Sequence, residues 1–238
     1  MVRETVVVDA RFCGPNDSGN GGYVCGLLGE RITGAAEVTL RMPPPLDKEL
    51  VIASSDDGSL RLLDDNELVA QARPADLDID IPDAPDYEVA SRAALGFRAF
   101  EDHVFRRCFV CGPDREPGDG LRIFAGPVAD TGVFAAPWIP DESLADAEGA
   151  VDPAYLWAAL DCPGYFGLGF ADNPACLLGR MTAEVDRGIR PGDRCVVIGW
   201  RIDQDGRKYH AGTALFGPDG RVHGSARSTW IRLKSAPP

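Results

Sequence analysis

Three runs near the C-terminus decide the fold: RCVVIGWRID (194–203), KYHAGTALF (208–216) and RVHGSARSTWIRL (221–233). Each is rich in β-branched and aromatic residues, and Asp-Gly pairs separate them. Apolar runs divided by Asp-Gly turns are typical of antiparallel strands joined by tight hairpins. We therefore predict an antiparallel meander over residues 194–233.

The first half of the chain has the same order of elements. EVTLRM (37–42) indicates a strand, as LLGRMTAEVD (177–186) does in the second half. Without a gap, LVAQARPADL (68–77) aligns with VHGSARSTWI (222–231). The identity is weak by itself, but together with the shared order it favours a tandem duplication.

A helix is predicted before each meander, in GGYVCGLLGERI (21–32) and DPAYLWAALDCPGYFGLGF (152–170). Asp152 suits an N-cap and Pro153 the first helical position. The Pro-Gly pair at 163–164 is expected to end or kink the second helix.

An Asp- and Pro-rich stretch, PADLDIDIPDAPDYE, separates the halves and predicts a connecting segment. We place an N-terminal unit at 1–82, a linker at 83–103 and a C-terminal unit at 104–238.

Composition excludes several classes of protein. Of 238 residues, 45% are apolar and 26% charged, as in ordinary globular chains. The apolar runs are too short to span a bilayer, and Asp9 and Arg11 interrupt the N-terminal run, so no signal peptide is predicted. We expect a cytoplasmic protein without a membrane partner.

The formal net charge of −13 opposes nucleic-acid binding. The charge is uneven, because residues 176–238 carry 11 Lys and Arg against 6 Asp and Glu. One interpretation is solvated strand faces. The other is a patch that contacts the phosphates of a ligand such as coenzyme A. Its candidate residues are Arg187, Arg190, Arg194 and Lys208.

The seven cysteines are an odd number in a chain without a predicted secretory signal, so we expect reduced thiols. Cys108 and Cys111 form a CxxC motif. A zinc site usually needs four ligands, no second CxxC exists, and the chain has three histidines. We therefore expect no metal at this motif.

A helix followed by an antiparallel meander, present twice, resembles the double hotdog fold. The motifs CFVCGPDREPGDGLRIF (108–124) and YLWAALDCPGYF (155–166), echoed by FCGPNDSGNGGYVCGLLG (12–29), are similar to those of hotdog thioesterases. The resemblance implies an α+β fold in which a curved antiparallel sheet wraps each helix. It also implies a small-molecule acyl thioester as substrate and no cofactor. It is compatible with a homo-oligomer such as a dimer.

Aligning Tyr23 with Tyr155 places Gly29 opposite Asp161. Asp161 lies among apolar residues near a predicted helix end, and both features would raise its pKa. It could act as a general base or as a nucleophile on a thioester. The alternative is a structural role, accepting hydrogen bonds from backbone freed at the following proline. Gly29, its counterpart, is expected to tolerate alanine.

The other helix start carries Gly21 and Gly22 after Asn20. Unpaired N–H groups there could stabilise an oxyanion, and Asn20 could orient water or the thioester carbonyl. The alternative is a flexible loop with Asn20 as an ordinary N-cap. Asp17, in the same loop, is a second candidate for the base.

The sequence and the resemblance thus predict an acyl-CoA thioesterase-like hydrolase of double hotdog fold. A thiol-release assay is the test that separates this enzyme from a binding protein. The alternative is a non-catalytic acyl-CoA or fatty-acyl binding protein. An acyl dehydratase is less favoured, because the Asp-x-x-x-x-His pattern that such sites resemble is absent after Asp161 and Asp17.

Overall fold

The computed structural model describes residues 3–172 and 174–234, and within them one antiparallel sheet organises the chain. Its strands are β1 (Arg3–Val7), β2 (Ala36–Leu40), β3 (Glu49–Ser54), β4 (Leu60–Asp64), β5 (Glu67–Pro74), β6 (Gly126–Pro127), β7 (Val133–Trp138), β8 (Cys176–Val185), β9 (Cys195–Asp205), β10 (Lys208–Phe216) and β11 (Val222–Arg232). The helices are α1 (Gly21–Gly29), α2 (Tyr87–Ala94), α3 (Ala99–Asp102), α4 (Pro153–Ala159) and α5 (Cys162–Gly167), with 3₁₀ turns at Ala10–Phe12 and Glu142–Leu144.

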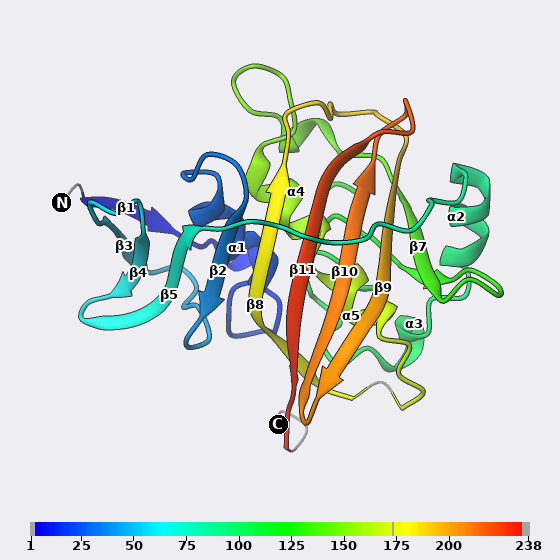
Figure 1. Cartoon of the computed structure of the whole chain (residues 1–238), viewed down its shortest axis with the longest axis horizontal. Helices are drawn as coiled ribbons and strands as arrows, with labels where there is room; N and C mark the ends of the chain where they lie inside the picture. The colour runs from blue at the N-terminus through cyan, green and yellow to red at the C-terminus, as the bar shows by residue number, and fades with distance from the viewer. Residues whose placement is uncertain (1–2, 173, 235–238) are drawn as a thin grey trace.

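The strand order is β1-β3-β4-β5-β2-β8-β11-β10-β9-β7-β6, with β2 paired to β8 at the centre (Figure 1). Outward from that pair, β2-β5-β4-β3-β1 on one side corresponds to β8-β11-β10-β9-β7 on the other. β5 and β11, which contain the gapless sequence match, occupy equivalent places. The order therefore has the symmetry that a tandem duplication predicts, although the two halves share one continuous sheet.

The predicted C-terminal meander is confirmed as β9, β10 and β11, which pair in sequence. β1, β6 and β7 were not predicted. Charged residues flank the apolar run of β1, and Pro137 lies within β7, so neither has a clear strand pattern.

α1, α4 and α5 lie on one face of the sheet, and the main hydrophobic core lies between them and the strands (Figure 1). α1 packs directly against α4. The second predicted helix is two helices, and its break lies earlier than predicted. Pro163 cannot donate to the carbonyl of Ala159 and its ring crowds that carbonyl, so α4 ends at Ala159. Asp161 lies in the resulting break.

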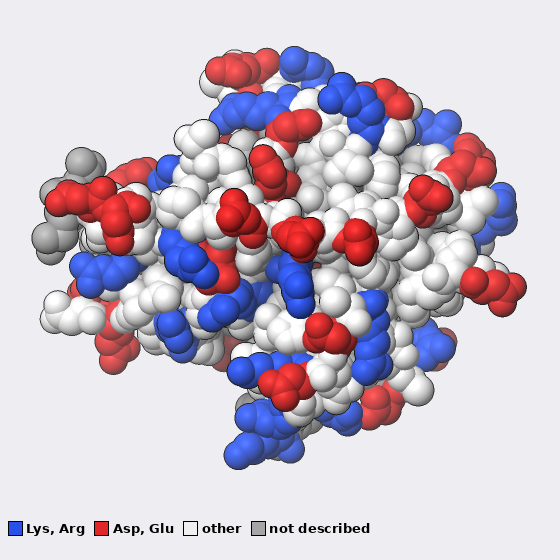
Figure 2. Space-filling view, in the orientation of Figure 1, with Lys and Arg blue, Asp and Glu red and all other residues white. Residues whose placement is uncertain are grey.

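The connection between the halves crosses the opposite face of the sheet (Figure 1). In DLDIDI (76–81) the Asp side chains are exposed, whereas the Leu and Ile side chains are half-buried. Ile79 and Ile81 pack against a second apolar cluster that contains Val196 and Ala214. Figure 2 shows acidic side chains in a row across this face. Residues 83–103, expected as a linker, contain α2 and α3.

No helix among the described residues is long and apolar enough to cross a membrane.

Candidate functional site

A mostly apolar cavity of about 250 Å³ lies where the N-terminus of α1 meets the break between α4 and α5. Strands β8 and β11 supply part of its wall. Its polar end contains Asn20 and Asp161, with Gly21, Cys108 and Cys162 beside them. The apolar wall includes Leu40, Met42, Pro44, Phe105, Cys176, Leu178, Trp230 and Ile231.

Asp161 is the buried acid of this cavity, with 2% of the residue exposed. Its Oδ2 accepts hydrogen bonds from Asn20 Nδ2 at 2.8 Å and from the Gly22 N–H at 3.0 Å. Its Oδ1 is buried and makes no hydrogen bond with the described residues. The side chain does not cap α5, so the structural role considered from the sequence does not describe its contacts. One carboxylate oxygen is therefore held by two donors, and the other is buried without a partner among the described residues.

Asn20 connects the start of α1 to Asp161. Its Oδ1 accepts from the Tyr23 N–H at 2.9 Å, which confirms it as the N-cap. Because the amide oxygen faces the helix, the Nδ2 group must face Asp161. Asn20 is thus both a cap and a donor to the buried carboxylate.

Burial raises the pKa of the Asp161 carboxyl to about 7. The hydrogen bonds from Gly22 and Asn20 oppose this rise, whereas negative charge on Cys108 adds to it. The carboxyl therefore takes up and releases a proton more easily near neutral pH than an exposed aspartate does.

Glycine at position 22 is required by a close approach. A Cβ there would lie 2.4 Å from the Asp161 Cβ, too close for any larger residue without rearrangement. The Gly22 N–H is already bonded to Asp161, so it is not free for an oxyanion. The Gly21 N–H makes no hydrogen bond with another described residue, and Gly21 lines the cavity. Gly21 is therefore the better candidate for an oxyanion donor.

The expectation that Gly29 tolerates alanine does not fit the packing of α1 on α4. A Cβ at this position would lie 2.3 Å from Cζ2 of Trp157 on α4. Alanine here would push the two central helices apart, so its effects would not be limited to local chemistry.

The remaining predicted residues lie away from the cavity. Asp17 is exposed and does not line it. Arg187 pairs with Asp146, and Arg194 pairs with Glu88. None of the four basic candidates lines the cavity. Arg187, Arg190 and Arg194 lie between β8 and β9, whereas Lys208 begins β10 at the opposite end of the β9–β10 hairpin.

The CxxC motif lies beside this site. Two further residues of types that bind metals lie next to it, and the sequence spacing did not predict them. Cys162 joins Cys108 and Cys111, and the three sulfur atoms lie within 4.8 Å of one another. His103 Nε2 is 3.1 Å from Cys111 Sγ. The expectation of no metal assumed that such partners were missing, and in three dimensions they are present.

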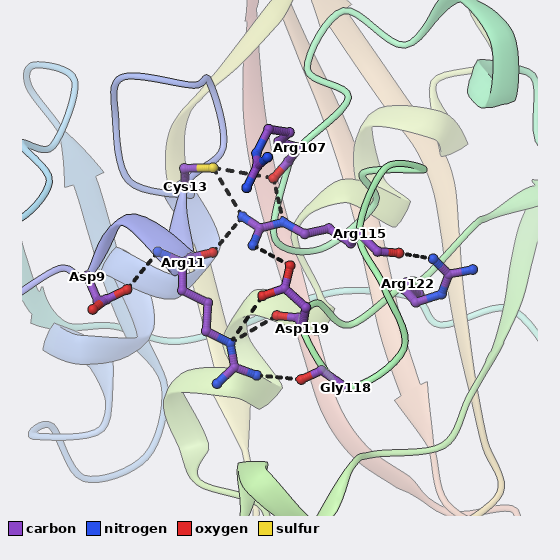
Figure 3. Close-up of polar contacts among 8 residues, drawn as sticks. All are labelled: Asp9, Arg11, Cys13, Arg107, Arg115, Gly118, Asp119 and Arg122. Carbon is purple, nitrogen blue, oxygen red and sulfur yellow. Dashed lines mark hydrogen bonds and ion pairs between the residues drawn. The ribbon is translucent and has the colours of Figure 1, made fainter.

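A buried arginine anchors the loop that carries the CxxC motif (Figure 3). Arg115 donates to the carbonyl oxygens of Arg107 at 2.7 Å and Arg11 at 2.6 Å, and pairs with Asp119 at 2.9 Å. Arg11 in turn donates to the Gly118 carbonyl at 2.7 Å. The network holds this loop against the segment that leads into α1.

Solved structures of similar architecture cover nearly the whole chain. The tesB protein of Mycobacterium avium subs paratuberculosis matches with a TM-score of 0.64 and 10% identity, over 97% of this chain and 93% of that one. The acyl-CoA thioesterase II TesB2 of Mycobacterium marinum matches at 0.62 and 11%, over 98% and 94%. A protein of unknown function with a hot dog fold from Alicyclobacillus acidocaldarius matches at 0.56 and 12%, over 98% and 94%.

The chain has the hotdog fold. The resemblance drawn from its sequence motifs is therefore confirmed at the level of the fold. No protein-family model matches the chain, and no curated protein matches its sequence.

Proposed function

We propose that the protein is a double hotdog acyl-thioester hydrolase, with coenzyme A as the expected carrier of the acyl group. The observation that carries this proposal is the burial and hydrogen bonding of the Asp161 carboxylate. Its Oδ2 is held by two donors, while its buried Oδ1 has no partner among the described residues, in a cavity with mostly apolar walls. An apolar cavity with a few fixed polar groups suits an acyl chain with a reactive carbonyl at one end.

In the proposed reaction, the Asp161 carboxylate takes a proton from a water molecule as that water attacks the thioester carbonyl. The Gly21 N–H and the N-terminal end of α1 stabilise the developing oxyanion. When the tetrahedral intermediate collapses, the carbon–sulfur bond breaks, and the thiolate leaves with the proton that Asp161 holds. The products are a free acid and a free thiol. The chemistry needs no cofactor.

The structural neighbours that are named thioesterases support this proposal through the fold alone, since their sequence identities are 10% and 11%. A non-catalytic acyl-binding protein would use the same apolar wall. It would not need a buried carboxylate with one free oxygen, because such a group is costly to desolvate.

A thiol-release assay over a panel of acyl-CoAs of increasing chain length tests the proposal. We expect catalytic release of thiol for at least one chain length. Saturable binding across the panel without thiol release would overturn the proposal and favour the binding protein.

Replacing Asn20 by serine tests how the carboxylate is positioned. Serine can still cap α1, but it removes the donor to Asp161 Oδ2. A hydrogen bond to a charged group contributes about 1.5–3 kcal/mol, so kcat is expected to fall roughly 10- to 100-fold with little change in KM. Steady-state kinetics with the best acyl-CoA measure this.

Asp152→Ser is the matched control, because Asp152 caps α4 and does not line the cavity. It should keep kcat near the wild-type value. An Asn20→Ser variant that also keeps wild-type kcat would show that the Asn20 amide does not support the carboxylate.

A further inference from the structure

Three thiols from distant parts of the sequence meet beside the candidate site. Cys108 and Cys111 lie on one loop, and Cys162 begins α5. All three are buried, and Cys108 Sγ is 3.6 Å from Cys162 Sγ. The hydrolysis proposed above makes no use of these groups.

The spacing of the sulfur atoms fits one shared metal ion. Tetrahedral zinc with metal–sulfur bonds of about 2.3 Å places two ligand sulfurs about 3.8 Å apart. The Cys108–Cys162 distance is close to this value, and the whole trio falls within 4.8 Å. Small side-chain rotations would therefore bring all three sulfurs onto one ion.

The CxxC motif forms a tight turn that holds Cys108 and Cys111 close together. The Gly112 N–H donates to the Cys108 carbonyl at 2.8 Å and closes the turn. A Cβ on Gly112 would lie 2.6 Å from both the Cys108 nitrogen and its carbonyl oxygen, so the tight turn requires glycine.

His103 supports this arrangement from outside. Its Nδ1 accepts the Phe105 N–H at 2.9 Å, so in the neutral ring the proton is on Nε2. Nε2 then donates to Cys111 Sγ at 3.1 Å. In this tautomer His103 is a hydrogen-bond partner of a ligand, as is common around metal sites.

A small cavity of about 50 Å³ adjoins the cluster and is lined by His103 and the three cysteines. It has room for one water-sized ligand. Three protein ligands with a fourth position open to a small molecule make up a recognised class of zinc site.

We propose that Cys108, Cys111 and Cys162 bind one thiophilic metal ion of the zinc class. On binding, the three thiols release their protons to solvent and form three metal–sulfur bonds. The prediction of no metal was based on ligands close in sequence, whereas the third ligand lies 54 residues from Cys108. Cys162 directly follows Asp161, so the ion would also brace the segment that carries the acid.

Cobalt(II) provides the test, because its spectrum reports ligand type and geometry independently of turnover. The full chain, reduced and stripped of metal with a chelator, is titrated with cobalt(II) and then with zinc(II). We expect one equivalent to bind with intense thiolate-to-cobalt charge-transfer bands, which zinc then abolishes. Cys162→Ser should lose most of this intensity.

Cys195→Ala is the matched control, because Cys195 is a buried thiol at the start of β9, outside the cluster. It should give the wild-type spectrum. The proposal is overturned if the reduced wild-type chain shows only the weak spectrum of hydrated cobalt(II). It is also overturned if Cys195→Ala reduces the charge-transfer bands as much as Cys162→Ser does.

Discussion

Asp161→Asn lowers kcat by about 10²–10⁴ on any acyl thioester that the wild-type protein hydrolyses, the range typical of a lost general base. Asparagine can keep the hydrogen bonds from Asn20 and Gly22 by placing its oxygen where Oδ2 lies. It cannot take a proton from water. The expected signature is a large fall in kcat with little change in KM.

The same substitution separates chemistry from folding. Because it removes a buried carboxylate with an unpaired oxygen, Asp161→Asn should melt at the wild-type temperature or above it. Thermal unfolding measured beside the kinetics checks this. If Asp161→Asn keeps near-full turnover while Asp17→Asn loses it, the exposed loop carboxylate is the base and our assignment is wrong.

Arg115→Gln should be strongly destabilising. The Arg115 guanidinium is 3% exposed and bonds to the carbonyls of Arg11 and Arg107. Glutamine cannot reach all of these acceptors, so partly buried carbonyls lose the donors that the buried guanidinium supplies, at a cost of about 3 kcal/mol. For a chain of this size that corresponds to a fall in Tm of roughly 6–12 °C.

Arg61→Gln is the control for charge removal alone, because Arg61 is exposed on β4. It should change Tm little. A Tm for Arg115→Gln equal to that of Arg61→Gln would show that the network in Figure 3 does not hold the loop.

Local patterns in the sequence predicted local structure well. Asp152 was expected as an N-cap, and the alternative interpretation of the loop before Gly21 made Asn20 one as well; both side chains accept an N–H from the first turn of their helix. The three C-terminal strands followed from β-rich runs between Asp-Gly turns. β1 and β7 escaped prediction because partners elsewhere in the sheet stabilise strands whose own patterns are weak.

The site depends on contacts that no local pattern contains. The hydrogen bond from Asn20 to Asp161 joins residues 141 positions apart, and it exists because α1 packs closely on α4 through Gly22. The sequence identified both residues as candidates but could not show that one holds the other. It favoured Asp161 over Asp17 as the base but left both open, because it could not show that Asp161 is buried and Asp17 exposed.

The contact between the cysteines was still harder to predict from the sequence. A count of metal ligands along the sequence finds only one CxxC pair. In the folded chain, Cys162 at the start of α5 lies beside Cys108 and Cys111. The position of the helix break sets this, because it places Asp161 and Cys162 on the side that faces α1 and the CxxC loop.

A single-turnover experiment tests the central claim most directly. An acyl-CoA is mixed with an excess of wild-type protein. The reaction is quenched at intervals, and free acid and free thiol are measured. We predict that both products appear together in equal amounts, and that Asp161→Asn leaves the thioester intact over the same period. Recovery of intact acyl-CoA from the wild-type protein across the chain-length panel, or equal product formation by the two proteins, would contradict it.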